Sequence, residues 1–243
     1  MWKRAMWKGA IPRGAERALL LFAVATVHFL LVPGLDAEAG GRGEARQLEF
    51  GRIEYLEGEV TVDEEPAELG EVVRPGSLIR TGPEGRCEIV FGDRNIFQLR
   101  ENTILRLRWE EKDAPRVAEL ERGSFAAVLD RLQELAGSPS FEVRTHTAVG
   151  GVRGTVFFVS VESEESTYIC TCNGETDLSG SSDDADRADR ASTAVDADYH
   201  TAYRFVQEGA TVSYQSAPLL YHTDEEMDTL AAKIGVTIPW SGY

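Results

Sequence analysis

The amino-acid sequence predicts an all-β protein of stacked β-hairpins, arranged as a sandwich or a solenoid, with one short helix near the C-terminus. Turn residues recur roughly every ten positions along most of the chain, which is the spacing of short strands joined by tight connections. Between the turns lie runs of β-branched and aromatic residues in which apolar and polar side chains alternate, as in half-buried strands. A single segment combines apolar residues at helical spacing with a helix-start signal.

The N-terminal segment has the pattern of an export signal. The charged residues at its start are mostly basic, and an uncharged apolar run follows at 18–35. The small residues Ala37 and Ala39 favour cleavage after Ala39, so residues 1–39 are predicted to be a signal peptide. The alternative is an uncleaved anchor, because the apolar run is just long enough to cross a membrane. In both cases we expect the rest of the chain in the periplasm, and in the second it is tethered to the inner membrane.

Residues 40–49 are rich in Gly and charged residues and are expected to form a linker. A β-domain is predicted over 50–178, and it opens with a hairpin at 53–62 that turns at Glu57-Gly58. Further strands are predicted at 72–74, 78–81, 87–91, 96–99, 104–109, 117–120, 141–145, 155–161 and 167–172. Residues 124–135 fit either a strand or a short helix.

Residues 179–198 differ in composition from the rest of the chain. Ser, Asp, Arg and Ala dominate there, and Val195 is the one sizeable apolar side chain. Such a segment cannot bury enough surface to offset the entropy of ordering. It is therefore predicted to be a disordered acidic loop.

The C-terminal part, 199–243, is predicted to hold two strands and the helix. The strands fall at 203–206 and 210–214. Thr223 can cap the free amides of the helix while Glu226 reaches back to it, which is the capping-box pattern. Apolar residues recur at helical spacing beyond this point, and Gly235 ends the helix.

Several turns of the predicted β-domain carry a recognisable set of motifs. The most specific is Ala148-Val149-Gly150-Gly151-Val152-Arg153-Gly154-Thr155, and shorter blocks lie at 57–60, 73–82, 86–91, 99–103 and 120–123. In order and spacing these blocks resemble the FecR-type domain family over about residues 50 to 175. The resemblance implies an all-β, periplasm-facing domain with no catalytic residues, found in membrane sensors that carry an iron-chelate signal to a cytoplasmic sigma factor and in stand-alone envelope proteins. Because only a short basic segment precedes the apolar run, we expect a stand-alone member without a cytoplasmic anti-sigma domain.

The charge balance restricts the partners. The chain has 25 Lys and Arg against 41 Asp and Glu, a formal net charge of -16, so it repels a phosphate backbone and we expect no nucleic-acid partner. No pair of nucleophile and base can be identified, since Ser124 and Ser138 lack a nucleophile-elbow context and His146 fits an alternating strand position. We therefore expect no enzyme and no cofactor. The expected partner is an envelope protein or polymer that binds at strand edges and turns.

The glycine motif is predicted to be structural. A nucleotide-binding loop needs a following helix, whereas a strand-like run begins directly at Thr155. The glycines, with Gly154 last, are instead expected to permit a tight connection between strands. Arg153 is predicted to act as a clamp that donates to carbonyls or to a carboxylate.

Cys170 and Cys172 are the sharpest candidates for a site. On a strand, residues two apart project to one face, so both sulfur atoms can point the same way. With His200 and His222 they would form a tetrahedral zinc-type or soft-metal site that fastens the C-terminal segment onto the β-domain. One alternative is a disulfide among Cys87, Cys170 and Cys172, which an oxidising compartment favours, and another is buried free thiols.

The sequence therefore predicts a non-enzymatic periplasmic module for binding, scaffolding or regulation at the bacterial envelope. Two alternatives remain open. One is a regulatory subunit of iron-type transmembrane signalling that acts through a separate membrane partner. The other is a metal-binding or redox protein that uses Cys170 and Cys172.

Overall fold

The structure, a computed structural model, describes residues 50–108, 115–130, 141–181 and 191–241. The predicted signal peptide or anchor at 1–39 and the linker at 40–49 lie outside these residues. Within the described part of the chain, no helix has both the length and the apolar character needed to cross a membrane.

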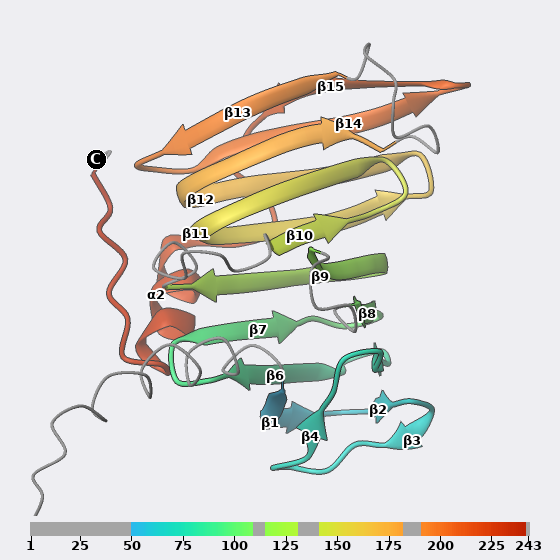
Figure 1. The fold of residues 1–243 in the computed structure, drawn as a ribbon, viewed down its shortest axis with the longest axis vertical. Coiled ribbons are helices and arrows are strands. Elements are labelled where there is room, and N and C mark those ends of the chain that lie inside the picture. Colours follow the sequence, from blue (N-terminus) through green and yellow to red (C-terminus); the bar gives the residue numbers. More distant parts are fainter. Residues whose placement is uncertain (1–49, 109–114, 131–140, 182–190, 242–243) are drawn as a thin grey trace, which may run out of the picture. The chain divides into compact units, whose positions relative to one another are not determined.

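A single connected set of β-strands dominates the fold, which confirms the predicted all-β class (Figure 1). The strands are β1 (Gly51–Glu57), β2 (Val60–Val62), β3 (Glu65–Pro66), β4 (Val72–Val73), β5 (Leu78–Thr81), β6 (Arg86–Phe91), β7 (Asn95–Leu99), β8 (Ile104–Arg108), β9 (Arg116–Leu129), β10 (Phe141–Arg144), β11 (Ala148–Ser163), β12 (Ser166–Gly180), β13 (Ser192–Ala197), β14 (Thr201–Glu208) and β15 (Thr211–Ala217). Helix α2 (Asp224–Ala232) follows them. The main strand order is β15-β14-β12-β11-β10-β9-β7-β6-β1-β4, with the remaining strands attached at its sides.

The long strand β9 organises the sheet, and its second half resolves the ambiguity at 124–135 as far as Leu129. Its first half pairs with β8 and runs parallel to β10, whereas its second half lies between β7 and β11. The apolar run 125–129 is buried at every position. A strand covered on both faces carries such a continuous apolar run, whereas a half-buried strand alternates. Residues 131–135 lie outside the described part.

Two hydrophobic cores lie on opposite faces of these central strands. Alternation along β11 sends Phe157 into one core and Phe158 into the other. The first core also takes side chains from β2, β5 and β8. The second core is closed by α2 and the residues after it, through Met227, Leu230 and Ile238. The helix thus covers the face that Phe158 presents.

The prediction of a disordered loop over 179–198 is wrong at both of its ends. Strand β12 continues to Gly180, and residues 192–197 form β13, which pairs with 174–179 of β12. Along β13 only Val195 and Ala197 are buried. The burial of these two small side chains, together with backbone hydrogen bonds to β12, is enough to order the strand. A composition argument misses this because the ordering comes from pairing with β12. Residues 182–190 lie outside the described part.

The glycine motif lies within β11 and does not connect two strands, contrary to expectation. Gly150 and Gly151 pair with Leu178 and Asp177 of β12. Gly154 alone among the three has a left-handed φ, +61°, at a register shift between β11 and β12. The motif therefore forms a β-bulge.

Arg153 does contact a carboxylate, as expected of the proposed clamp. Its Nη2 lies 3.1 Å from Asp177 Oδ2, but the two side chains are 66% and 59% exposed. An ion pair this exposed contributes little to stability. The bulge at Gly154 is thus a structural feature that the motif gives to the backbone.

Glu162 of β11 forms an ion pair with Arg204 of β14, and β12 separates these two strands in the sheet. Its two oxygens accept from Nε and Nη2 of Arg204 at 2.7 Å each, and the hydroxyl of Tyr221 donates to it at 2.6 Å. The hydrogen bonds from Arg204, with further ones from Tyr221 and Ser166, outweigh burial and lower the pKa of Glu162 to about 2. The carboxylate is therefore favoured in the folded state.

Replacing Glu162 with Gln should destabilise the fold in a pH-dependent way. At neutral pH we expect a loss of about 1–3 kcal/mol, because a charge-assisted contact is lost. A depressed pKa stabilises the fold above the unfolded value of 4.5 and loses this effect as the pH falls toward about 2. The difference between Glu162→Gln and the wild type should therefore shrink over that range in urea titrations. Glu54→Gln, which removes an exposed ion pair with Arg52, should change the free energy of unfolding little at any pH. If the stability difference between Glu162→Gln and the wild type were the same at every pH, the lowered pKa of Glu162 would be contradicted.

Candidate metal centre

Two cysteines of β12 face the second core together. Cys170 and Cys172 are fully buried, and their Sγ atoms lie 3.9 Å apart. This confirms the expectation that alternation along a strand points both sulfurs the same way. Cys87 of β6 belongs to the opposite core, and all three cysteines are free thiols in the structure. The geometry therefore gives no support to a disulfide that involves Cys87.

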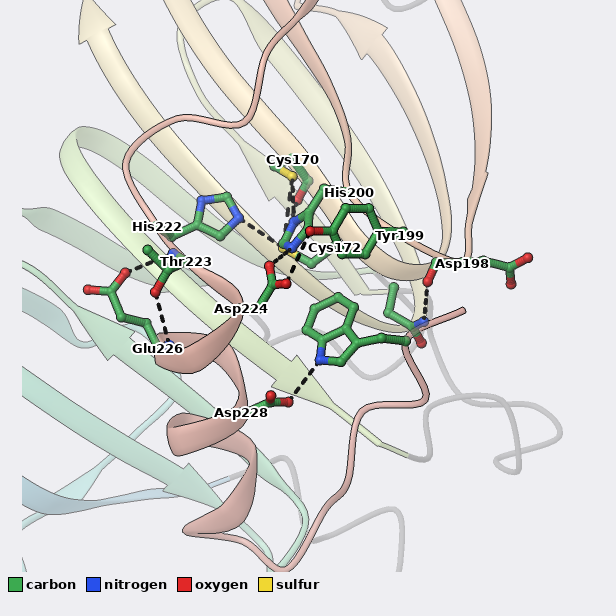
Figure 2. A network of polar contacts seen from close by, with 12 residues as sticks. Cys170, Cys172, Asp198, Tyr199, His200, His222, Thr223, Asp224, Glu226 and Asp228 are labelled. Carbon is green, nitrogen blue, oxygen red and sulfur yellow. Dashed lines mark hydrogen bonds and ion pairs between the residues drawn. The ribbon is translucent and has the colours of Figure 1, made fainter. Parts of the chain in front are cut away.

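His200 approaches these sulfurs from the connection between β13 and β14 (Figure 2). Its Nδ1 lies 3.5 Å from Cys170 Sγ. On the other side of the ring, Nε2 lies 2.8 Å from Oδ1 of Asp224, while the Tyr199 hydroxyl donates to Oδ2 of the same carboxylate at 3.1 Å. The indole of Trp240 stacks on the imidazole at 5.0 Å between ring centroids. His200 is thus oriented by groups on three sides.

His222 reaches the site from the segment between β15 and α2. Its Nε2 lies 3.2 Å from Cys172 Sγ, and its Nδ1 lies 2.9 Å from the carbonyl oxygen of Leu220. Phe158 stacks on the ring at 4.6 Å between centroids. The next residue, Thr223, caps α2 as predicted: it accepts from the amide of Glu226 at 3.2 Å and its own amide donates to that side chain at 2.9 Å. The cap fixes the chain direction directly after His222.

The structure brings together all four residues proposed as metal ligands. Their ligand atoms lie within 4.8 Å of one another. His146 lies outside this cluster and is exposed in the connection between β10 and β11. Sequence reasoning missed Asp224, whose position in the first turn of a helix had a sufficient explanation in the helix dipole. It also missed Trp240, since nothing local links that residue to His200.

The two kinds of buried cysteine differ in their electrostatics. A hydrogen bond from Cys172 lowers the pKa of Cys170 well below its ordinary value, against burial and with help from His200 and His222. Burial raises the pKa of its neighbour Cys172. Burial opposes charge on His200 too, but its hydrogen bonds to Cys170 and Asp224 prevail and raise its pKa. Cys87 has no such partners, and burial raises its pKa to about 12.

Cys170, His200 and Asp224 also resemble a catalytic triad, in which a base activates a nucleophile and an acid orients the base. Burial argues against catalysis, because Cys170 is 0% exposed and the His200 side chain only 3%. A cavity of about 350 Å³ lies nearby, between the strand ends and 236–239. Its lining includes neither Cys170 nor His200, and the charged groups in it, Arg94 and Asp130, pair with each other. The arrangement therefore suits a closed site better than one that admits a substrate.

Comparison with known proteins finds a family that matches the central part of the chain. Residues 77–175 match the family described as FecR protein. Over these residues the chain is similar to that family. The match includes Cys170 and Cys172 near its end, whereas His200 and His222 lie beyond it. The four-residue cluster is thus shared between the matched region and the C-terminal segment, and the family match does not account for it.

Two crystal structures of a protein from Parabacteroides distasonis ATCC 8503, described as a proposed anti-sigma factor, are similar to the chain at 16% and 15% identity, both with a TM-score of 0.43. Each alignment covers 57% of this chain and 59% of that one, so the chain spans about 59% of the length of that protein. No curated protein matches the chain. The family match alone supports a role as a regulatory module.

Proposed function

We propose that this protein is a non-enzymatic regulatory module of the bacterial envelope, which binds a protein or polymer partner in the periplasm. The observation that carries the proposal is the match to the FecR family at 77–175. The basic start of the chain and the apolar run at 18–35 support export. The burial of Cys170 and His200 supports a non-enzymatic role.

Strand β15 is the best candidate for the contact surface. It ends the main strand order and, among the described strands, it pairs only with β14. Its residues are exposed or half-buried throughout. An extended segment of a partner can add to such an edge through backbone hydrogen bonds. We therefore favour an envelope protein that presents an extended segment over a small ligand.

Two measurements test this proposal. A reporter enzyme that is active only outside the cytoplasm, fused after residue 243, should be active. A photo-crosslinking residue at Gln215 of β15 should capture a partner in intact cells, while the same residue at exposed Asp93 should not. Capture of an inner-membrane receptor would favour the signalling-subunit alternative. An inactive fusion that accumulates at normal levels would refute the periplasmic location.

A further inference from the structure

We infer that Cys170, Cys172, His200 and His222 bind one zinc-class metal ion, which fastens the C-terminal segment 218–241 to the region that matches the FecR family. The ligand would be a soft or borderline cation, Zn²⁺ or Cu⁺. The inference goes beyond the proposed function and does not depend on the identity of the partner.

The spacing of the ligand atoms fits a tetrahedral ion. With metal–sulfur bonds of about 2.3 Å and metal–nitrogen bonds of about 2.0–2.1 Å, a tetrahedron separates two sulfurs by about 3.8 Å and a sulfur from a nitrogen by about 3.5 Å. The structure has 3.9 Å between the sulfurs of Cys170 and Cys172. The distances to the facing nitrogens of His200 and His222 are 3.5 Å and 3.2 Å. The longest separation within the cluster is about 4.8 Å, so the more distant ligands would have to move by about 1 Å to complete the site.

Both imidazoles are held with the correct nitrogen toward the sulfurs. Nδ1 of His222 donates to the carbonyl of Leu220, so its Nε2 carries a lone pair. In His200 the two nitrogens have the opposite roles: when the neutral ring donates from Nε2 to Asp224, Nδ1 has the lone pair that a metal would bind. Metal-binding histidines in proteins commonly donate their second nitrogen to a carboxylate or a backbone carbonyl in this way. One histidine here has each kind of partner.

The donor set selects the class of metal. Two thiolates and two imidazoles suit zinc and copper(I), whereas calcium and magnesium require oxygen ligands. Two thiolates balance the charge of a divalent ion, so the buried site would be neutral. All four ligands come from the protein and Cys170 and Cys172 are fully buried, so no position is open to water or substrate. Such closed sites are structural.

The four ligands come from different parts of the chain, so the ion would hold these parts together. Cys170 and Cys172 belong to β12, His200 to the connection before β14, and His222 to the segment that leads into α2. Trp240, near the end of the described chain, stacks on His200 and donates to Asp228 of α2 at 3.0 Å. The ion would therefore join the matched region to both ends of the C-terminal segment.

The direct test is metal binding by the full chain. Protein kept reduced and stripped with a chelator is titrated with Zn²⁺, and bound metal is counted by mass spectrometry. In parallel, Co²⁺ serves as a spectroscopic probe. We expect one ion per chain, and thiolate-to-cobalt charge-transfer absorption together with the intense visible bands of tetrahedral Co²⁺.

Variants identify the ligands. Cys172→Ser and His222→Gln should each weaken Co²⁺ binding by more than about 100-fold and change its absorption, because each removes a ligand. Asp224→Asn should weaken binding by about 10–100-fold but keep the thiolate bands, because Asp224 positions His200 without touching the metal. Cys87→Ala and His146→Gln are matched controls outside the cluster and should bind as the wild type does. Circular dichroism establishes that each variant is folded.

Three results would overturn the inference. The first is reduced wild-type protein that binds neither Zn²⁺ nor Co²⁺. The second is unchanged binding by folded Cys172→Ser and His222→Gln. The third is a disulfide between Cys170 and Cys172 in protein whose thiols are blocked at the moment of cell lysis.

Discussion

Removal of the inferred metal ion should free the two ends of the C-terminal segment and lower the stability of the whole protein. A ligand that binds only the folded state stabilises it in proportion to the logarithm of its free concentration. Free Zn²⁺ at a thousandfold excess over its dissociation constant should therefore add about 4 kcal/mol to the free energy of unfolding. Urea titrations at a series of buffered Zn²⁺ concentrations measure this dependence. Limited proteolysis with mass spectrometry should show new cuts at 218–223 and 236–241 after chelation.

The variants of the cluster give this prediction its control. Cys172→Ser should lose most of this dependence, because an affinity loss of more than about 100-fold removes at least about 2.7 kcal/mol of the stabilisation by Zn²⁺. His146→Gln should retain the full dependence on Zn²⁺, because His146 is exposed and lies outside the cluster. A protein whose unfolding and proteolysis are independent of Zn²⁺ would show that the C-terminal segment is held by packing alone.

Packing should keep α2 partly attached without metal. The helix is too short to be stable alone, but it buries Met227, Leu230 and Ala231 in the second core. Beyond its end, Lys233 Nζ lies 2.6 Å from both oxygens of the buried Glu88 of β6. At its start, Arg100 contacts Glu226 at 3.2 Å. We therefore expect the flanking segments to become mobile before the helix detaches.

The local parts of the fold could be predicted from sequence because their signals are local. The capping box of α2 needs only Thr223 and Glu226, three residues apart. The common face of Cys170 and Cys172 needs only the period of a strand. Strand β13 lacked such a signal, because its order depends on pairing with a strand that the composition of 192–197 does not reveal. The parallel pairing of β10 with β9 depends in the same way on the register of distant strands.

The four-residue cluster could be predicted only in part for a related reason. Residue type suggested His200 and His222, but it suggests His146 equally, and only the tertiary fold leaves His146 exposed. The groups that orient His200 come from Asp224 and Trp240, which reach it across the fold. Residue type therefore indicates which side chains could bind a metal, but only the folded structure shows how they are oriented.

The motifs that resemble the FecR family are brought together physically in the fold. The hydroxyl of Thr81 accepts from the amide of Thr103 at 2.9 Å, and the hydroxyl of Thr103 accepts from the amide of Ser124 at 3.1 Å. The amide of Asn102 donates to the carbonyl of Gly82 at 3.0 Å. Nε of Arg122 also donates to the carbonyl of Asn102 at 3.3 Å. Three sequence blocks, 73–82, 99–103 and 120–123, thus converge where β9 passes from pairing with β8 to pairing with β7. Their residue types follow from this close approach.

Gly123→Ala should therefore be among the most damaging single-methyl additions in the protein. Gly123 has φ +83°, and a Cβ atom there would lie 2.5 Å from Thr103 Cα and 2.8 Å from the carbonyl oxygen of Asn102, so backbone would have to move. A left-handed Ala costs about 1–2 kcal/mol and overpacking typically adds about 1–3 kcal/mol, so we expect a total loss of about 2–5 kcal/mol in urea unfolding. Gly70→Ala is the matched control, because Gly70 has φ +84° with no atom within 4 Å of the added Cβ and so bears only the dihedral cost. Equal losses in the two variants would mean that the three motif blocks do not meet as closely as the structure shows.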